Sequence, residues 1–208
     1  MPHNFINILH KYLQEETLPG VKSQLKMAPA EKLFDKPNIG YKKAAVLILL
    51  YYKNQQLSTV LIKRNKYPGV HSGQISFPGG QKEKEDKTLV YTAIRETQEE
   101  IGVNLQKIKI LGTLTPLYIY VSNFDVLPVV GFLDGIPNFN PDKNEVDSII
   151  EVKIKDFLIE KNVGQFTFNR VGQKIKAPCY VVGNQRIWGA TAMIISELAE
   201  IVKANSQL

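Results

Sequence analysis

The chain has 208 residues, of which 44% are hydrophobic and 22% charged, so it can bury one well-filled core and is not expected to be disordered. Its formal net charge of +6 favours anionic partners, but the lysines are dispersed and no aromatic-interleaved basic motif predicts a nucleic-acid partner. The single Cys179 excludes an intramolecular disulfide and is typical of a reducing compartment.

Residues 1–40 predict a helical lead-in to the main domain. Apolar side chains recur at helical spacing at Phe5, Leu9, Tyr12 and Leu13, and Pro19-Gly20 breaks the pattern. We expect a short amphipathic helix that packs on the core or on a second subunit of a homodimer, followed by a polar stretch. No basic stretch precedes an apolar run, so we expect no secretory signal and a cytoplasmic location.

The next segment predicts two strands and a glycine-rich loop. Residues 44–52 form an apolar run typical of a buried strand, and residues 57–64 return as a second strand after a turn at 54–56. The run 44–52 is shorter than the roughly 20 residues that a membrane-spanning helix needs, so we expect no membrane partner. The loop 65–76 leads into Phe77-Pro78-Gly79-Gly80.

The remainder of the chain mixes helices and strands. We expect a helix at 87–100, which Gly102 closes in a left-handed cap. The other expected elements are strands at 107–114, 126–133 and 148–154, a loop over the site at 115–125, a helical turn at 155–160, a hairpin of 166–168 with 177–182, and a closing helix at 190–203. Because no internal repeat divides this pattern, the sequence predicts a single α/β domain at 41–208.

The predicted helix at 87–100 carries three carboxylates on one face. Glu96, Glu99 and Glu100 stand at positions i, i+3 and i+4, so their side chains are crowded. Carboxylates this close repel one another unless a cation lies among them, and Mg²⁺ prefers such oxygen ligands while keeping sites for water and substrate phosphate. The opposite face is suited to burial on a sheet and carries Val90, Ile94, Thr97 and Ile101.

Residues 80–103 resemble the Nudix box, the signature of hydrolases that split a diphosphate linked to another group. Arg95-Glu96, Glu99-Glu100 and Gly102 match the end of that signature position by position. Asp86 stands for the first acid with one extra residue in the spacing, and Thr97 occupies a slot that is usually apolar. The resemblance implies an α/β/α sandwich with a mixed sheet, and Mg²⁺ or Mn²⁺ as the cofactor.

The residues before this signature resemble the coenzyme A pyrophosphatase branch of the family. That branch has an additional signature that ends in Gly, any three residues and Phe-Pro-Gly-Gly, and residues 73–80 fit this ending. Leu61 and Arg64 match earlier positions of the same signature. Ile62 and Gly69 stand where the branch has Thr and Arg. Further similar segments lie at 122–124, 128–131, 145–146 and 188–192. The resemblance implies a small-molecule substrate, coenzyme A or a derivative, cleaved to 3′,5′-ADP and 4′-phosphopantetheine.

The resemblance also implies roles for individual residues. The expected metal ligands are Glu96, Glu99, Glu100, Asp86 and the backbone carbonyl of Gly80. The expected catalytic residues are Glu96, Glu99, Glu145 and Arg95, which would orient an acid through an ion pair. The expected substrate-binding residues are Arg64, Gly79, Gly80, Ser122 and Phe124.

Several alternatives stay open at this point. Asp86 is either a metal ligand or a capping acid at the helix start, and Glu145 is a ligand, a base or a surface residue. Phe124 either stacks on an adenine or packs in the core, Trp188 is expected to pack against the sheet, and the loop residue His71 is kept out of the catalytic set. The alternative functions are hydrolysis of another nucleoside diphosphate derivative (ADP-ribose, a dinucleoside polyphosphate or a nucleoside triphosphate) and a non-catalytic nucleotide-binding module.

Overall fold

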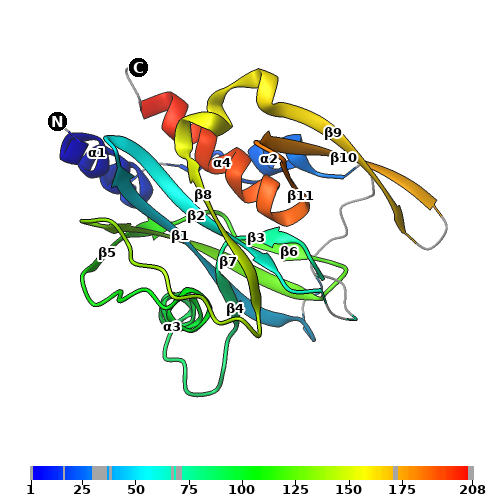
Figure 1. Ribbon diagram of the computed structural model, residues 1–208, viewed down its shortest axis with the longest axis horizontal. Helices are drawn as coiled ribbons and strands as arrows, with labels where there is room; N and C mark the ends of the chain where they lie inside the picture. Colours follow the sequence, from blue (N-terminus) through cyan, green and yellow to red (C-terminus); the bar gives the residue numbers. More distant parts are fainter. Residues whose placement is uncertain are drawn as a thin grey trace.

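The computed structural model describes residues 2–15, 17–29, 37, 39–66, 68, 72–170 and 173–205. Gly69 and His71, and residues 30–36 of the predicted lead-in, lie outside the described residues. An eight-stranded sheet forms the centre of the molecule, and a three-stranded sheet extends from one side of it (Figure 1).

The large sheet is built around β1 (Lys42–Lys53), the predicted buried strand. β1 pairs in parallel with β7 (Phe124–Leu133) and antiparallel with β2 (Gln56–Arg64), so the sheet is mixed, as the sequence predicts. The order across it is β3-β2-β1-β7-β5, with β3 at Ile75–Ser76 and β5 at Ile108–Thr113. Three more strands pair with β1, β7 and β2 respectively: β4 (Gly79–Gln81), β6 (Leu117–Ile119) and β8 (Val146–Lys153).

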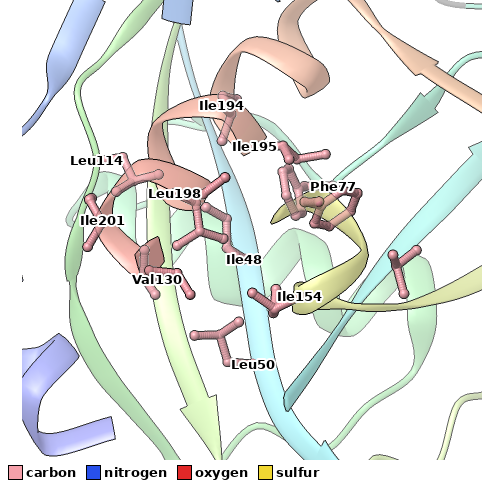
Figure 2. Close-up of a cluster of buried hydrophobic side chains, with 14 of the residues drawn as sticks. Ile48, Leu50, Phe77, Leu114, Val130, Ile154, Ile194, Ile195, Leu198 and Ile201 are labelled. Carbon is pink, nitrogen blue, oxygen red and sulfur yellow. The ribbon is translucent and has the colours of Figure 1, made fainter. Parts of the chain in front are cut away.

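Helices cover both faces of this sheet, which explains why β1 is an almost continuous apolar run. Ala45, Leu47 and Leu49 belong to the buried cluster beside α3 (Leu89–Ile101), whereas Ile48 and Leu50 belong to the cluster beside α4 (Gly189–Asn205). Figure 2 shows side chains of α4 packed over β1, with Leu198 close to Ile48. The predicted α/β/α sandwich is therefore confirmed.

The N-terminal residues pack on the α4 side of the sheet. α1 (Pro2–Glu15) buries Ile6, Leu9 and Leu13 in the same cluster as α4. Pro19-Gly20 does not end the helical region, because α2 (Gly20–Gln24) and the 3-10 turn η1 (Leu25–Met27) follow at once. The polar stretch expected there is therefore partly helical. The division into 1–40 and 41–208 stays a prediction, and so does the homodimer.

One buried carboxylate ties this N-terminal segment to the rest of the protein. Glu197 of α4 is fully buried and accepts hydrogen bonds from the backbone N–H of Gly20, from the side-chain amide of Gln24 and from the hydroxyl and N–H of Thr115. These donors come from two separate segments, α2 and the residues after β5, so the glutamate of α4 holds both of them in place.

We expect Glu197→Ala to lower the free energy of unfolding by about 3 kcal/mol, because it leaves several buried donors without an acceptor. For a chain of this size, that corresponds to a fall in Tm of roughly 6–12 °C in a thermal unfolding experiment. Glu160→Ala, at an exposed glutamate, is the control and should change Tm little. An unchanged Tm for Glu197→Ala would contradict this account.

The small sheet follows β8 through two 3-10 turns, η2 (Ile154–Leu158) and η3 (Glu160–Asn162). Its strands are β9 (Val163–Arg170), β10 (Gln173–Val182) and β11 (Gln185–Trp188), in the order β11-β10-β9. The predicted hairpin is confirmed, and β11 is an additional strand that the sequence analysis did not predict. In the described part of the chain, no helix has the length and apolar character needed to cross a membrane.

Candidate active site

The acidic helix α3 begins and ends where local sequence signals place it. The Thr88 hydroxyl accepts a hydrogen bond from the N–H of Tyr91 (3.1 Å), which caps the first turn. Gly102 has φ 65°, and its N–H donates to the carbonyl of Gln98 at 2.9 Å, so the predicted left-handed cap is confirmed. Asp86 lies before the cap and is therefore not the capping residue.

The face of α3 that packs on the sheet tolerates a threonine in its middle. Ala93, Thr97 and Ile101 are buried, whereas Val90 and Ile94 are only partly buried at its edge. The Thr97 hydroxyl donates to the carbonyl of Ala93 at 2.6 Å, so this buried hydroxyl has a partner. The unusual Thr97 of the motif thus fits the core.

Gly79 and Gly80 lie in β4, which runs antiparallel to β1, rather than in a turn. Gly79 has φ +145°, and a Cβ there would collide with the backbone of Ala45 and Val46. A Cβ on Gly80 would instead meet the carboxylate of Glu96. The two glycines therefore let the β4 backbone lie directly against the sheet on one side and against α3 on the other.

Glu100 is buried beneath this strand and is held by the chain itself. Its carboxylate accepts a hydrogen bond from the N–H of Gly79 (2.7 Å) and forms an ion pair with a guanidinium nitrogen of Arg64 (3.0 Å). The same guanidinium donates to the carbonyl of Gly79 at 3.0 Å. Burial raises the pKa of Glu100 to about 7, although Arg64 and the Gly79 N–H oppose the shift.

Arg95 gathers the other acids of the motif. Its guanidinium donates to both carboxylate oxygens of Asp86 (3.0 and 2.9 Å), to Glu96 (2.9 Å) and to Glu99 (2.9 Å). Asp86 is 3% exposed and also accepts from the hydroxyl of Thr92, and its bonds to Arg95 hold the pKa of this carboxyl well below its usual range. Asp86 is therefore a buried ion-pair partner of Arg95.

The three predicted glutamate ligands lie in different environments. Glu100 is buried, Glu96 is partly buried and Glu99 is exposed on the helix surface. Burial raises the pKa of Glu96, an effect that Arg95 opposes. Among the described residues, no three His, Cys, Asp or Glu side chains are grouped closely enough to hold a metal by themselves. One or two carboxylates suffice for Mg²⁺, which keeps waters and takes substrate phosphates as further ligands, so Glu96 and Glu99 fit such an ion.

A cavity of about 690 Å³ extends from these acids to the small sheet. The predicted site residues that line it are Arg64, Gly79, Gly80, Glu96, Glu100, Ser122, Phe124 and Glu145. Asp86, Arg95 and Glu99 are not among the lining residues. The loop predicted to cover the site contributes Tyr118 to Ser122, although β6 forms part of it. A cavity of this size falls in the usual range for small-molecule sites.

The opposite end of the cavity contains residues that the sequence analysis did not include in the site. Phe168, Trp188 and Thr191 line it, together with Met193 and Ile194 of α4. Trp188 packs against Phe168 of the small sheet, with ring centroids 4.5 Å apart. The alternation of Phe166 and Phe168 on β9 is a sequence signal for a shared aromatic face.

Comparison with known proteins gives consistent results. The NUDIX domain model matches residues 41–168. The uncharacterized Nudix hydrolase NudL of Photorhabdus laumondii subsp. laumondii is 33% identical over 180 residues, which cover 86% of this chain and 94% of the relative. The mitochondrial coenzyme A diphosphatase NUDT8 of Mus musculus is 34% identical over 155 residues, which cover 73% of each chain. The crystal structure of RenU, a Nudix hydrolase from M. smegmatis, matches with a TM-score of 0.53 at 12% sequence identity. The match covers 86% of this chain and 95% of the RenU chain, and it supports the fold alone.

Proposed function

Since this chain belongs to the Nudix family and is a hydrolase of nucleoside diphosphate derivatives, we propose that it acts on coenzyme A or its derivatives and cleaves them to 3′,5′-ADP and 4′-phosphopantetheine. The observation that carries the proposal is that one cavity is lined both by the acidic helix and by the segment 73–80 that resembles the coenzyme A branch. The relative named as a coenzyme A diphosphatase supports the same substrate.

Nudix hydrolases generally need divalent cations, and we propose Mg²⁺ or Mn²⁺ here. Glu96, Glu99 and the carbonyl of Gly80 would hold the ion. A bound divalent ion neutralises charge on the diphosphate oxygens and acidifies a bound water. The ligand roles of Glu100 and Asp86 stay predictions, and their contacts with Arg64, Gly79 and Arg95 favour positioning roles instead.

The other predicted residues are assigned roles that follow from their positions. Arg95 would hold Glu96 and Glu99 in place through its hydrogen bonds to both carboxylates. Glu145 is exposed at the cavity wall, so it is available to accept the proton of the attacking water. Arg64 would act on the substrate mainly through the Gly79 backbone and Glu100 that it holds. Ser122 and Phe124 would contact the organic part of the substrate.

A substrate panel with product identification by mass tests this proposal. We expect kcat/KM for coenzyme A, measured with Mg²⁺ or Mn²⁺, to exceed that for ADP-ribose, dinucleoside polyphosphates and nucleoside triphosphates by about tenfold or more. The products should be 3′,5′-ADP and 4′-phosphopantetheine, and a chelator should abolish turnover. A clear preference for another nucleotide would reject coenzyme A as the substrate.

A further inference from the structure

Three aromatic rings are clustered at the end of the cavity that lies away from the acidic helix. Phe168 and Trp188 have ring centroids 4.5 Å apart at an interplanar angle of 37°. Phe166 lies behind them, 5.8 Å from Phe168 and 5.5 Å from Trp188. All three side chains are only partly buried, unlike the aromatic side chains of the core such as Tyr51 and Phe77.

The register of the small sheet explains why these rings meet. Phe168 pairs with Ile175, Phe166 with Ala177, and Trp188 with Cys179, so all of them lie on one face. Their partners on β10 are buried, with Ala177 and Cys179 almost completely inaccessible. The rings therefore pack beside buried residues of β10, and the ring surface that is not buried is available to a ligand.

Phe168 and Trp188 line the cavity that Glu96 and Glu100 also line, whereas Phe166 does not line it. We propose that Phe168 and Trp188 form a stacking platform for the adenine base of the substrate, while its diphosphate lies at the acidic end of the cavity. This assignment rests on the proposed function, because it takes the ligand to be an adenine nucleotide.

The chemistry of the cavity walls favours the base at this position. A purine has two flat faces that match ring surfaces, and stacking of a base on an aromatic side chain is a sequence-tolerant and substantial source of affinity. The cavity lining also includes aliphatic side chains such as Leu117 and Ile119. Such side chains suit the flexible pantetheine arm, which has no ring to stack.

Trp188 allows this proposal to be tested without turnover, because it is the only tryptophan in the chain. We expect adenosine 3′,5′-bisphosphate and AMP to quench its fluorescence in a saturable way, with excitation at the red edge of the indole band where adenine does not absorb. Ribose 5-phosphate and 4′-phosphopantetheine, which carry no base, should not quench it. Quenching by 4′-phosphopantetheine instead would assign the platform to the pantetheine arm and overturn the proposal.

Substitutions at the platform should change KM more than kcat, because stacking binds substrate and transition state alike. Trp188→Leu and Phe168→Leu are each expected to raise KM for coenzyme A by about tenfold, and Trp188→Phe should restore most of the affinity. Phe166→Leu is the matched control: it removes a ring from the same cluster but not from the cavity wall, so KM should stay within about twofold of wild type. Equal effects of Phe166→Leu and Phe168→Leu would overturn the proposal in favour of a purely structural cluster.

The two measurements separate this inference from the proposed function. If adenine nucleotides quench Trp188 but coenzyme A is not hydrolysed, the platform stands and the substrate is another adenine nucleotide. If coenzyme A is hydrolysed but no base-containing ligand quenches Trp188, the function stands and the platform is rejected. The quenching test uses the wild-type protein, so it holds even if a Trp188 variant does not fold.

Discussion

Replacing Glu96 by Gln should lower kcat by about a thousand-fold, which corresponds to roughly 4 kcal/mol of lost transition-state stabilisation. Glu96 lines the cavity, lies against Gly80 and accepts a hydrogen bond from Arg95 at 2.9 Å. The glutamine keeps the shape of the side chain but removes the charge that a divalent ion requires. The fold should survive, because Arg95 keeps its two hydrogen bonds to Asp86.

Steady-state kinetics and calorimetric titration of Mg²⁺ or Mn²⁺ into the metal-free protein measure this effect. Both kcat and the metal affinity should fall, whereas Tm should stay close to that of wild type. Glu85→Gln is the control, since Glu85 is exposed and does not line the cavity, and it should behave as wild type. Near wild-type turnover by Glu96→Gln would show that this face of α3 does not carry the chemistry.

Gly80→Ala should lower kcat by about a hundredfold without unfolding the protein, because a small displacement of a catalytic group is costly. The added Cβ would collide with the carboxylate of Glu96, which is the flexible end of a side chain and can move aside. The displaced carboxylate then no longer faces the cavity as it does in the native protein. Steady-state kinetics and thermal unfolding of the purified variant measure the two effects separately.

Gly79→Ala provides the contrast to Gly80→Ala. Here the Cβ would collide with the backbone of Ala45 and Val46, and φ at this position is +145°, so the strand itself must shift. We expect a clear fall in Tm in addition to the loss of activity. If both variants lost the same amount of stability, the separate roles assigned to the two glycines would be wrong.

Local sequence patterns were sufficient to predict most of the strands and the helix that position the site. The hydrophobic runs of β1 and β2, the amphipathic period of α3 and the cap at Gly102 are encoded within short windows, and the structure confirms each of them. β4 was not predicted in this way, because it is short and pairs with residues of β1 that are distant in the sequence. β11 was missed although it forms a local hairpin with β10, in which Val182 pairs with Gln185, because it has only four residues.

The departures from the family signature at Asp86 and Thr97 also show what the sequence encodes locally and what tertiary contacts decide. The sequence allowed two roles for Asp86, metal ligand or capping acid of the helix. In the structure its carboxylate accepts hydrogen bonds from Arg95, and Thr88 caps the helix instead. Thr97 occupies a slot that is usually apolar, and its hydroxyl bonds to the carbonyl of Ala93 one turn earlier. The choice of partner in each case depends on side-chain geometry, which spacing alone does not contain.

The sequence by itself indicated the type of chemistry, because three glutamates on one helical face next to a glycine-rich loop are typical of a site for a divalent cation and phosphate. Only the tertiary structure decided how these acids differ. Glu100 is buried, where it bonds to the Gly79 N–H and pairs with Arg64, and Asp86 forms an ion pair with Arg95. Glu96 lines the cavity. The tertiary structure also placed Phe168 and Trp188 at the far end of that cavity. Such contacts join segments far apart in the chain, and their energies depend on burial and on long-range strand pairing rather than on local periodicity.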